Sequence, residues 1–195
     1  TTIVPDLSFG IVGRALGLAW TPFGGELLYL EAMLNNTGSG KLKKTGNLGS
    51  VMQESIDVAY SYIASNHSST VASKKDLLKE IDVHIHVPQG AISKDGPSAG
   101  LGIAIALYSA LHRALIRPSL AMTGELSLSG HVGAIGGLRE KCLAPQRMGI
   151  QHVIIPKENQ HELALLPQSI QEALDIHLIS HIEEAIALCF ADTEH

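Results

Sequence analysis

Apolar and polar side chains alternate without interruption over residues 81–87, which makes this segment the clearest strand in the sequence. A period of two sends successive side chains to opposite faces of a strand. The apolar side chains therefore share one face, and His84 and His86 lie on the other. We predict a sheet strand with one buried face and one polar face that carries two histidines.

Four other segments are predicted to be helices. In the first and the last of them, apolar residues recur three or four positions apart, the spacing of one helix face. Asn47 or Ser50 is a candidate cap for the first. The second is rich in Ala, Gly, Leu and Ile, which indicates tight packing, and the third follows a Gly-Gly pair. The predicted helices span residues 51–63, 101–111, 138–148 and 182–190.

Short apolar runs bounded by turn-forming residues predict further strands. Two such runs within residues 13–34 flank a Thr-Pro-Phe-Gly-Gly turn at 21–25, with Trp20 at the end of the first run, a pattern typical of a β-hairpin. The other predicted strands span residues 41–45, 120–123, 130–135, 152–155 and 175–179. Strands and helices are interspersed without a repeat, so we predict an α+β fold with mixed α/β layers.

Size and composition favour a single domain over residues 1–195, because 45% hydrophobic content can fill one core and no linker composition interrupts the chain. The sequence begins at Thr1 rather than Met, so we expect a fragment of a longer polypeptide, although a processed start would give the same beginning.

Charge and cysteine content narrow the classes of function. The 14 Lys and Arg against 19 Asp and Glu give a formal net charge of -5 without a dense basic stripe, which argues against nucleic acid as a partner. No apolar run reaches the roughly 18 residues that a membrane span needs. Cys142 and Cys189 are too few for a disulfide framework, so we expect a reducing compartment.

Ser98 lies between two glycines, in the run Lys-Asp-Gly-Pro-Ser-Ala-Gly at residues 94–100. In the first turn of the following helix, it would have backbone N–H groups and the positive end of the helix dipole beside it, as attack on a carbonyl requires. The run also fits the Gly-x-Ser-x-Gly pattern of the α/β-hydrolases. The context differs, however, because the clear strand ends near Val87 and Pro97 restricts the backbone where that turn needs freedom.

Two other interpretations of this run stay open. A glycine-rich helix start with a capping serine needs no chemistry at all. Alternatively, the backbone donors at the helix start can cradle a phosphate, and the loop resembles that of the GHMP small-molecule kinases.

Several further segments agree with one known family in order and spacing. The chain resembles the proteolytic domain of the A-type Lon proteases, ATP-dependent serine peptidases of the bacterial cytoplasm and the mitochondrial matrix. The resemblance covers about residues 17–190 and implies the fold of that domain. The segments are Gly-Leu-Ala-Trp-Thr at 17–21, Gly-Asn-Leu-Gly at 46–49, Gln-Glu-Ser at 53–55, His-Ile-His-Val-Pro at 84–88, residues 94–100, Ala-Met-Thr-Gly-Glu at 121–125 and Ile-Gly-Gly-Leu-Arg-Glu-Lys at 135–141.

The resemblance implies that Ser98 is the nucleophile and Lys141 its general base, a Ser-Lys dyad. To accept a proton at neutral pH, a lysine must have its pKa lowered by roughly three units from about 10.4, which burial supplies. Thr123 matches the family threonine whose hydroxyl holds the lysine amine. The oxyanion donors are expected among the backbone N–H groups around Gly96, Pro97, Ser98 and Ala99.

Asp95, His84, His86 and Glu31 match positions that line or border the active site in the family. Asp95 is either a partner for a cation, a regulator of loop opening, or a turn residue. His84 and His86 share a strand face at a spacing that can bind metal, but without an evident third ligand, so we predict supporting hydrogen bonds instead. Gln89 and the Ile-Ser pair at 92–93 depart from the common family sequence, which leaves open whether the loop at 89–97 is active or occluding.

Other candidate nucleophiles and bases carry less weight. Asp175 with His177 or His181 formally permits a His-based triad with the serine, which the lysine scheme makes unnecessary. Cys142 and Cys189 are expected to be packed core thiols.

The resemblance implies no metal and no nucleotide at the proteolytic site. It implies ATP and Mg²⁺ in a separate AAA+ module outside this chain, unfolded or damaged proteins as substrates, and a homo-hexamer. The expected location is the cytoplasm, or alternatively the mitochondrial matrix, with no membrane partner. The sequence leaves the cleavage-site preference open.

Overall fold

A seven-stranded mixed sheet organises the protein, and the computed structural model describes it through residues 10–21, 24–46, 48–68, 79–88 and 96–190. The sheet order is β3-β4-β2-β1-β5-β8-β9, and β6 and β7 form a separate two-stranded pair. The strands are β1 (Arg14–Thr21), β2 (Gly24–Asn35), β3 (Leu42–Gly46), β4 (Asp82–Val87), β5 (Leu120–Met122), β6 (Glu125–Leu126), β7 (Val132–Gly133), β8 (His152–Pro156) and β9 (Asp175–Ile179).

The predicted hairpin forms at the centre of this sheet. Strands β1 and β2 pair antiparallel from Arg14↔Glu31 to Thr21↔Gly24. On its other side, β1 runs parallel to β5 through the pair Gly17↔Met122. From β5 outward to β9 every pairing is parallel, so one half of the sheet is built from crossover connections and the other half contains the hairpin.

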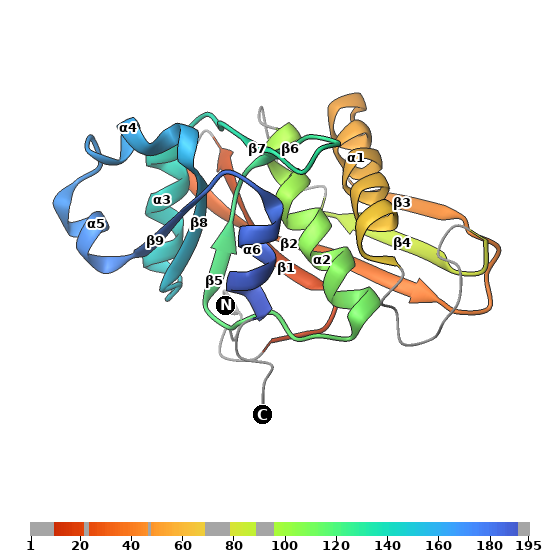
Figure 1. Ribbon diagram of the computed structural model, residues 1–195. Coiled ribbons are helices and arrows are strands. Elements are labelled where there is room, and N and C mark those ends of the chain that lie inside the picture. Colours follow the sequence, from red (N-terminus) through yellow and green to blue (C-terminus); the bar gives the residue numbers. More distant parts are fainter. Residues whose placement is uncertain (1–9, 22–23, 47, 69–78, 89–95, 191–195) are drawn as a thin grey trace.

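Helices cover both faces of the sheet (Figure 1). Each face has its own core cluster, and neighbouring residues of one strand alternate between them: Ala121 belongs to one cluster and Met122 to the other. The first cluster includes α1, α2 and α6, and the second includes α3 and α5. The helices are α1 (Ser50–Asn66), η2 (Gly96–Ala99), α2 (Gly100–His112), α3 (Leu138–Arg147), η3 (Lys157–Asn159), α4 (Gln160–Leu163), α5 (Gln168–Ala173) and α6 (Ile182–Phe190).

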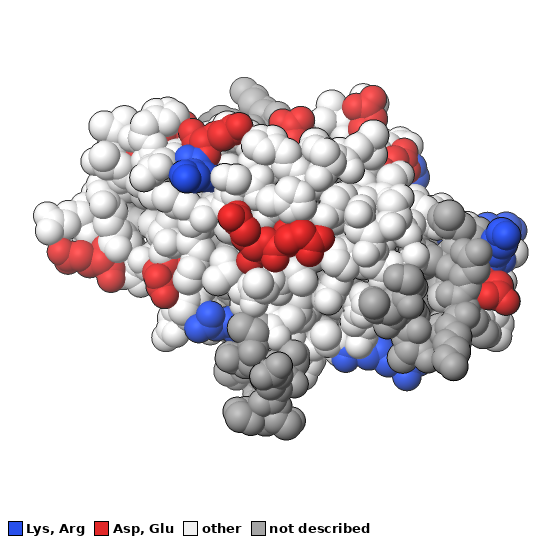
Figure 2. Space-filling view, in the orientation of Figure 1, with Lys and Arg blue, Asp and Glu red and all other residues white. Residues whose placement is uncertain are grey.

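A patch of acidic side chains lies over the start of α6 on the face shown in Figure 2. The first turn of this helix carries Glu183 and Glu184. The Glu184 carboxylate accepts the backbone N–H groups of Ser180 and His181, which caps the helix. Glu183 accepts the hydroxyl of Tyr62 at 2.6 Å and thereby ties α6 to α1.

The predicted mixed α/β layers are confirmed, and α6 and β9 have the predicted bounds. The N-cap of α1 is Gly49, so Ser50 is the first helical residue rather than the cap, and Asn47 lies outside the described residues. The strand predicted at 130–135 is shorter, because β7 covers Val132–Gly133 alone. Helices α4 and α5 were not predicted, since each is too short to show a helical period. None of the helices among the described residues is both long and apolar enough to cross a membrane.

Candidate active site

Three polar side chains from different elements meet inside the protein. The Nζ atom of Lys141, in the first turn of α3, lies 3.1 Å from Oγ of Ser98 in η2. The same amine donates to Oγ1 of Thr123, which follows β5, at 3.4 Å. The side chains of Lys141 and Thr123 are fully buried, and Ser98 is 6% exposed. The amine and the two hydroxyls therefore form a hydrogen-bonded group with little access to water.

Backbone hydrogen bonds hold the serine and the threonine in register. The N–H of Gly124 donates to the carbonyl of Ser98 at 3.0 Å, and the N–H of Leu101 donates to the carbonyl of Gly124 at 3.2 Å. The N–H of Thr123 donates to the carbonyl of Ile154 on β8 at 3.1 Å. The segment after β5 is thus fixed to both the start of α2 and the neighbouring strand.

Two glycines let α3 bring its lysine to this point. Gly137 precedes the helix with φ at 67°, a left-handed conformation that glycine adopts without strain, and its carbonyl accepts the N–H of Lys141. Gly25 on β2 lies directly under the helix, where an added Cβ would overlap the carbonyl of Glu140. A larger residue at position 25 would push away the turn that carries Lys141.

The amine of Lys141 is placed to exchange a proton with the serine. It is fully buried, and its nitrogen lies within hydrogen-bond distance of the Ser98 hydroxyl. This arrangement is suited to nucleophilic catalysis by Ser98.

The cysteine beside the lysine is not suited to the same task. Burial raises the pKa of the Cys142 thiol to about 12. Burial also raises the pKa of Cys189. Both thiols are buried, so both remain protonated at neutral pH and pack in the core as expected.

Comparison with known proteins agrees with this geometry. The sequence model of the Lon protease (S16) C-terminal proteolytic domain matches residues 8–192. The chain belongs to this family. It is 49% identical over 181 residues to the Lon protease of Lawsonia intracellularis, which is 93% of this chain and 22% of that protein. It is 51% identical over 175 residues to Lon protease 2 of Desulfotalea psychrophila, which is 90% of this chain and 22% of that protein. The chain therefore spans about a fifth of the length of these relatives.

The backbone at Ser98 differs from the strand-to-helix turn that the α/β-hydrolase pattern requires. Gly96 and Pro97 lie in the same 3-10 turn as Ser98, so the serine is approached from helical backbone rather than directly from a strand. This agrees with the mismatch found in the sequence.

Three of the other predicted site residues come together on the half of the sheet formed by β2, β3 and β4. The rings of His84 and His86 both contact Oγ1 of Thr45, each at 2.8 Å. Glu31 is in register with His86 across β2 and β4, and all three line one surface hollow together with Arg14. The histidines thus make hydrogen bonds, as predicted, while their part in the chemistry stays a prediction.

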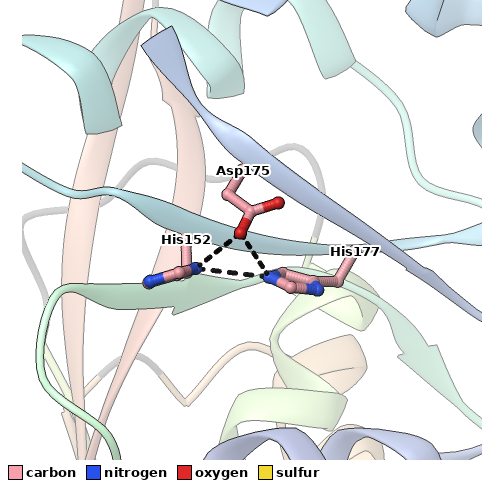
Figure 3. Close-up of side chains that lie close together, drawn as sticks. All are labelled: His152, Asp175 and His177. Carbon is pink, nitrogen blue, oxygen red and sulfur yellow. Dashed lines mark hydrogen bonds and ion pairs between the residues drawn. The ribbon is translucent and has the colours of Figure 1, made fainter. Parts of the chain in front are cut away.

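The remaining predicted residues have separate outcomes. Ala99 is buried in the first core cluster, and Asp95 lies outside the described residues. His181 is engaged through its ring with the carbonyl of Ser129 and the N–H of Glu183. Asp175 and His177 meet His152, so these members of the formal triad belong to a different cluster (Figure 3).

Sequence reasoning missed two residues that matter here. Gly25 was assigned to a turn, because its contact with Glu140 joins residues far apart in the chain. His152 was assigned to a strand without a role, because its partners lie on the next strand of the sheet. A partial signal for His152 existed: it and Asp175 are the first residues of two predicted strands, and the structure pairs these strands in parallel.

Proposed function

We propose that this domain is a serine endopeptidase in which Ser98 attacks the peptide carbonyl and Lys141 is the general base. The observation that carries the proposal is the 3.1 Å approach of a fully buried amine to a serine hydroxyl at the start of a helix. Membership of the Lon proteolytic family supports the same chemistry.

The proposed reaction has two stages, acylation of Ser98 and hydrolysis of the acyl-enzyme. The Ser98 Oγ–H proton passes to Nζ while Oγ bonds to the carbonyl carbon, and the tetrahedral intermediate holds the negative charge on its oxygen. The Lys141 ammonium then protonates the leaving amine as the peptide C–N bond breaks. Water next attacks the acyl-enzyme, gives one proton to Nζ, and releases the new carboxyl end while the proton returns to Oγ.

Two supporting roles follow from this scheme. Thr123 positions the amine, because its hydroxyl accepts from Nζ and thereby restricts the lysine rotamer. The oxyanion is stabilised by backbone N–H groups of the turn at Gly96–Ala99, and Pro97 is excluded as a donor because proline lacks an N–H. Neither the proton transfer nor the acyl transfer needs a metal or a nucleotide.

The proposal also includes a longer protein in which this domain would work together with other modules. We infer that unfolded or damaged proteins are the substrates and that a AAA+ module binds ATP and Mg²⁺ to deliver them. The chain matches about a fifth of its relatives, which leaves room in such proteins for that module. A homo-hexamer in the cytoplasm, or alternatively in the mitochondrial matrix, completes the proposal.

The decisive experiment combines labelling and hydrolysis. A fluorophosphonate should label the wild-type chain at Ser98, and a fluorogenic unstructured peptide should be cleaved. Ser98→Ala should lose both signals, with peptide hydrolysis reduced by at least about 10³-fold. Cys142→Ala is the matched control and should keep both, because this thiol has no part in the scheme.

The alternative classes of function give different results. Labelling at another residue, or cleavage that survives in Ser98→Ala, would refute the assignment of the nucleophile. Absence of labelling and cleavage in the folded wild type would favour an interaction domain. Tight binding of ATP to this chain in calorimetry would favour the kinase interpretation.

A further inference from the structure

Three side chains of the types that can bind a metal lie together at the edge of the sheet. None of them has a role in the proposed proteolytic site. His152 begins β8, and Asp175 begins the edge strand β9, with His177 two residues later. The two strands are parallel, with His152 opposite Asp175 and Ile154 opposite His177. Figure 3 shows the two rings and the carboxylate pointing toward one another.

The distances among the three facing atoms are those of a coordination shell. Nδ1 of His152 lies 3.3 Å from Nε2 of His177 and 3.3 Å from Oδ2 of Asp175. The third side of the triangle, from Nε2 of His177 to Oδ2 of Asp175, is 3.6 Å. Tetrahedral Zn²⁺ with bonds of about 2.1 Å places neighbouring ligand atoms about 3.4 Å apart. The three atoms therefore already outline one face of such a tetrahedron.

Both ring nitrogens face the same carboxylate oxygen. If both carry a hydrogen and donate to Oδ2 of Asp175, the two N–H groups face each other with their nitrogens 3.3 Å apart. A cation at the centre would instead bind a lone pair from each of the three atoms.

We propose that His152, Asp175 and His177 bind a divalent transition metal of the Zn²⁺ class, with water as the fourth ligand. Two imidazoles and one carboxylate are a ligand set that Zn²⁺ prefers. Among the described residues, these are the one group of three His, Cys, Asp or Glu side chains with ligand atoms close enough to share an ion. Arg117 is a positive charge that acts on His152, and the carboxylate of Asp175 offsets it.

The metal is structural in this proposal. It joins the first residue of β8 to the edge strand β9, whose outer side has no further strand in the described sheet. The same strand β8 accepts the backbone hydrogen bond of Thr123 through Ile154. Because the metal binds the folded arrangement and not the separated strands, Zn²⁺ stabilises the fold.

Binding of Zn²⁺ to untagged, chelator-treated chain, measured by isothermal titration calorimetry, tests the site. The wild type should bind one equivalent. His177→Gln and Asp175→Asn should each weaken binding by at least about tenfold, because each removes a ligand or its charge. His131→Gln is the matched control, because His131 contacts Glu158 at 3.0 Å in an exposed pair outside the cluster, and it should bind as the wild type does.

Two further readouts separate a coordination site from loose binding to surface histidines. Co²⁺ should give the visible absorption of a tetrahedral complex with the wild type and His131→Gln, and not with His177→Gln. Zn²⁺ should raise the thermal midpoint of the same two proteins and leave that of Asp175→Asn unchanged. The Asp175 side chain is 64% exposed, so its substitution leaves the core intact.

The proposal fails if the wild type takes up no Zn²⁺, or if His177→Gln and Asp175→Asn bind as tightly as it does. These readouts are independent of peptide hydrolysis, so the fate of the dyad assignment does not affect them.

Discussion

The group around Lys141 and the cluster around His152 are both small sets of polar side chains, but they differ in their access to water. Ser98, Thr123 and Lys141 meet between α3 and the start of α2, and the lysine is fully buried. The histidine cluster lies at the sheet edge with an exposed carboxylate. Burial keeps water away from the amine and the two hydroxyls, whereas the exposed carboxylate leaves the histidine cluster accessible to a cation from solution.

The largest expected effect comes from removing the buried amine. Lys141→Met keeps an unbranched apolar chain of similar shape, so peptide hydrolysis should fall by at least about 10³-fold while the free energy of unfolding is retained or increases. Lys141→Ala should lose the same activity and also destabilise the fold by about 2–5 kcal/mol, because it leaves a cavity. Peptide kinetics and urea unfolding measure the two quantities. If Lys141→Met still cleaves the peptide, the buried amine has no chemical role and the contrast with the histidine cluster is wrong.

The second prediction tests whether burial of the Lys141 amine depends on the close contact between α3 and β2 at Gly25. Gly25→Ala should destabilise the fold by about 1–3 kcal/mol and lower peptide hydrolysis, because the new methyl group overlaps the carbonyl beside Lys141. Gly133→Ala is the control, since its Cβ would meet its neighbours at 3.8 Å or more. Equal effects of the two substitutions in urea unfolding and kinetics would show that the close approach at Gly25 is unimportant.

A smaller effect is expected when the positioning hydroxyl is removed. Thr123→Val preserves shape and leaves the amine with less restraint, so kcat should fall by roughly 10–100-fold with little change in KM. Thr123→Ser restores the hydroxyl and should recover most of kcat. If Thr123→Ser is as impaired as Thr123→Val, the residue acts through packing and not through its hydrogen bond to Lys141.

The smallest effect is expected at Asp82, a carboxylate at the surface that belongs to neither group of side chains. The backbone N–H of Lys41, followed by that of Ser39, donates to Asp82 and holds the pKa of its carboxyl below the usual value. Between the pKa of Asp82 in the folded chain and its higher pKa in the unfolded chain, the unfolded chain binds more protons. The carboxylate therefore stabilises the fold above the unfolded-state pKa, and this stabilisation is lost as the pH falls through the folded-state pKa. Asp82→Asn should therefore lower stability at pH 7 more than at pH 3 in urea unfolding. An equal loss at both pH values would contradict the assignment.

Much of the local structure was predictable because it depends on near neighbours. The alternation at 81–87 gives β4, and the apolar spacing at 182–190 gives α6 with the predicted bounds. The run at 94–100 identified Ser98 because a serine between glycines before a small-residue helix is a local pattern. The resemblance then supplied Lys141 and Thr123, neither of which is marked by its own surroundings in the sequence.

The amino-acid sequence by itself determined most strands of the large sheet, the longer helices, the family resemblance and the candidates for nucleophile and base. The tertiary structure alone decided that the lysine amine lies 3.1 Å from the serine, that Gly25 makes room for α3, and that His152 joins Asp175 and His177. The physical reason is that periodicity reports which face of an element is buried, whereas these contacts depend on how separate elements pack. Burial of the amine and the meeting of the three ligands are properties of that packing.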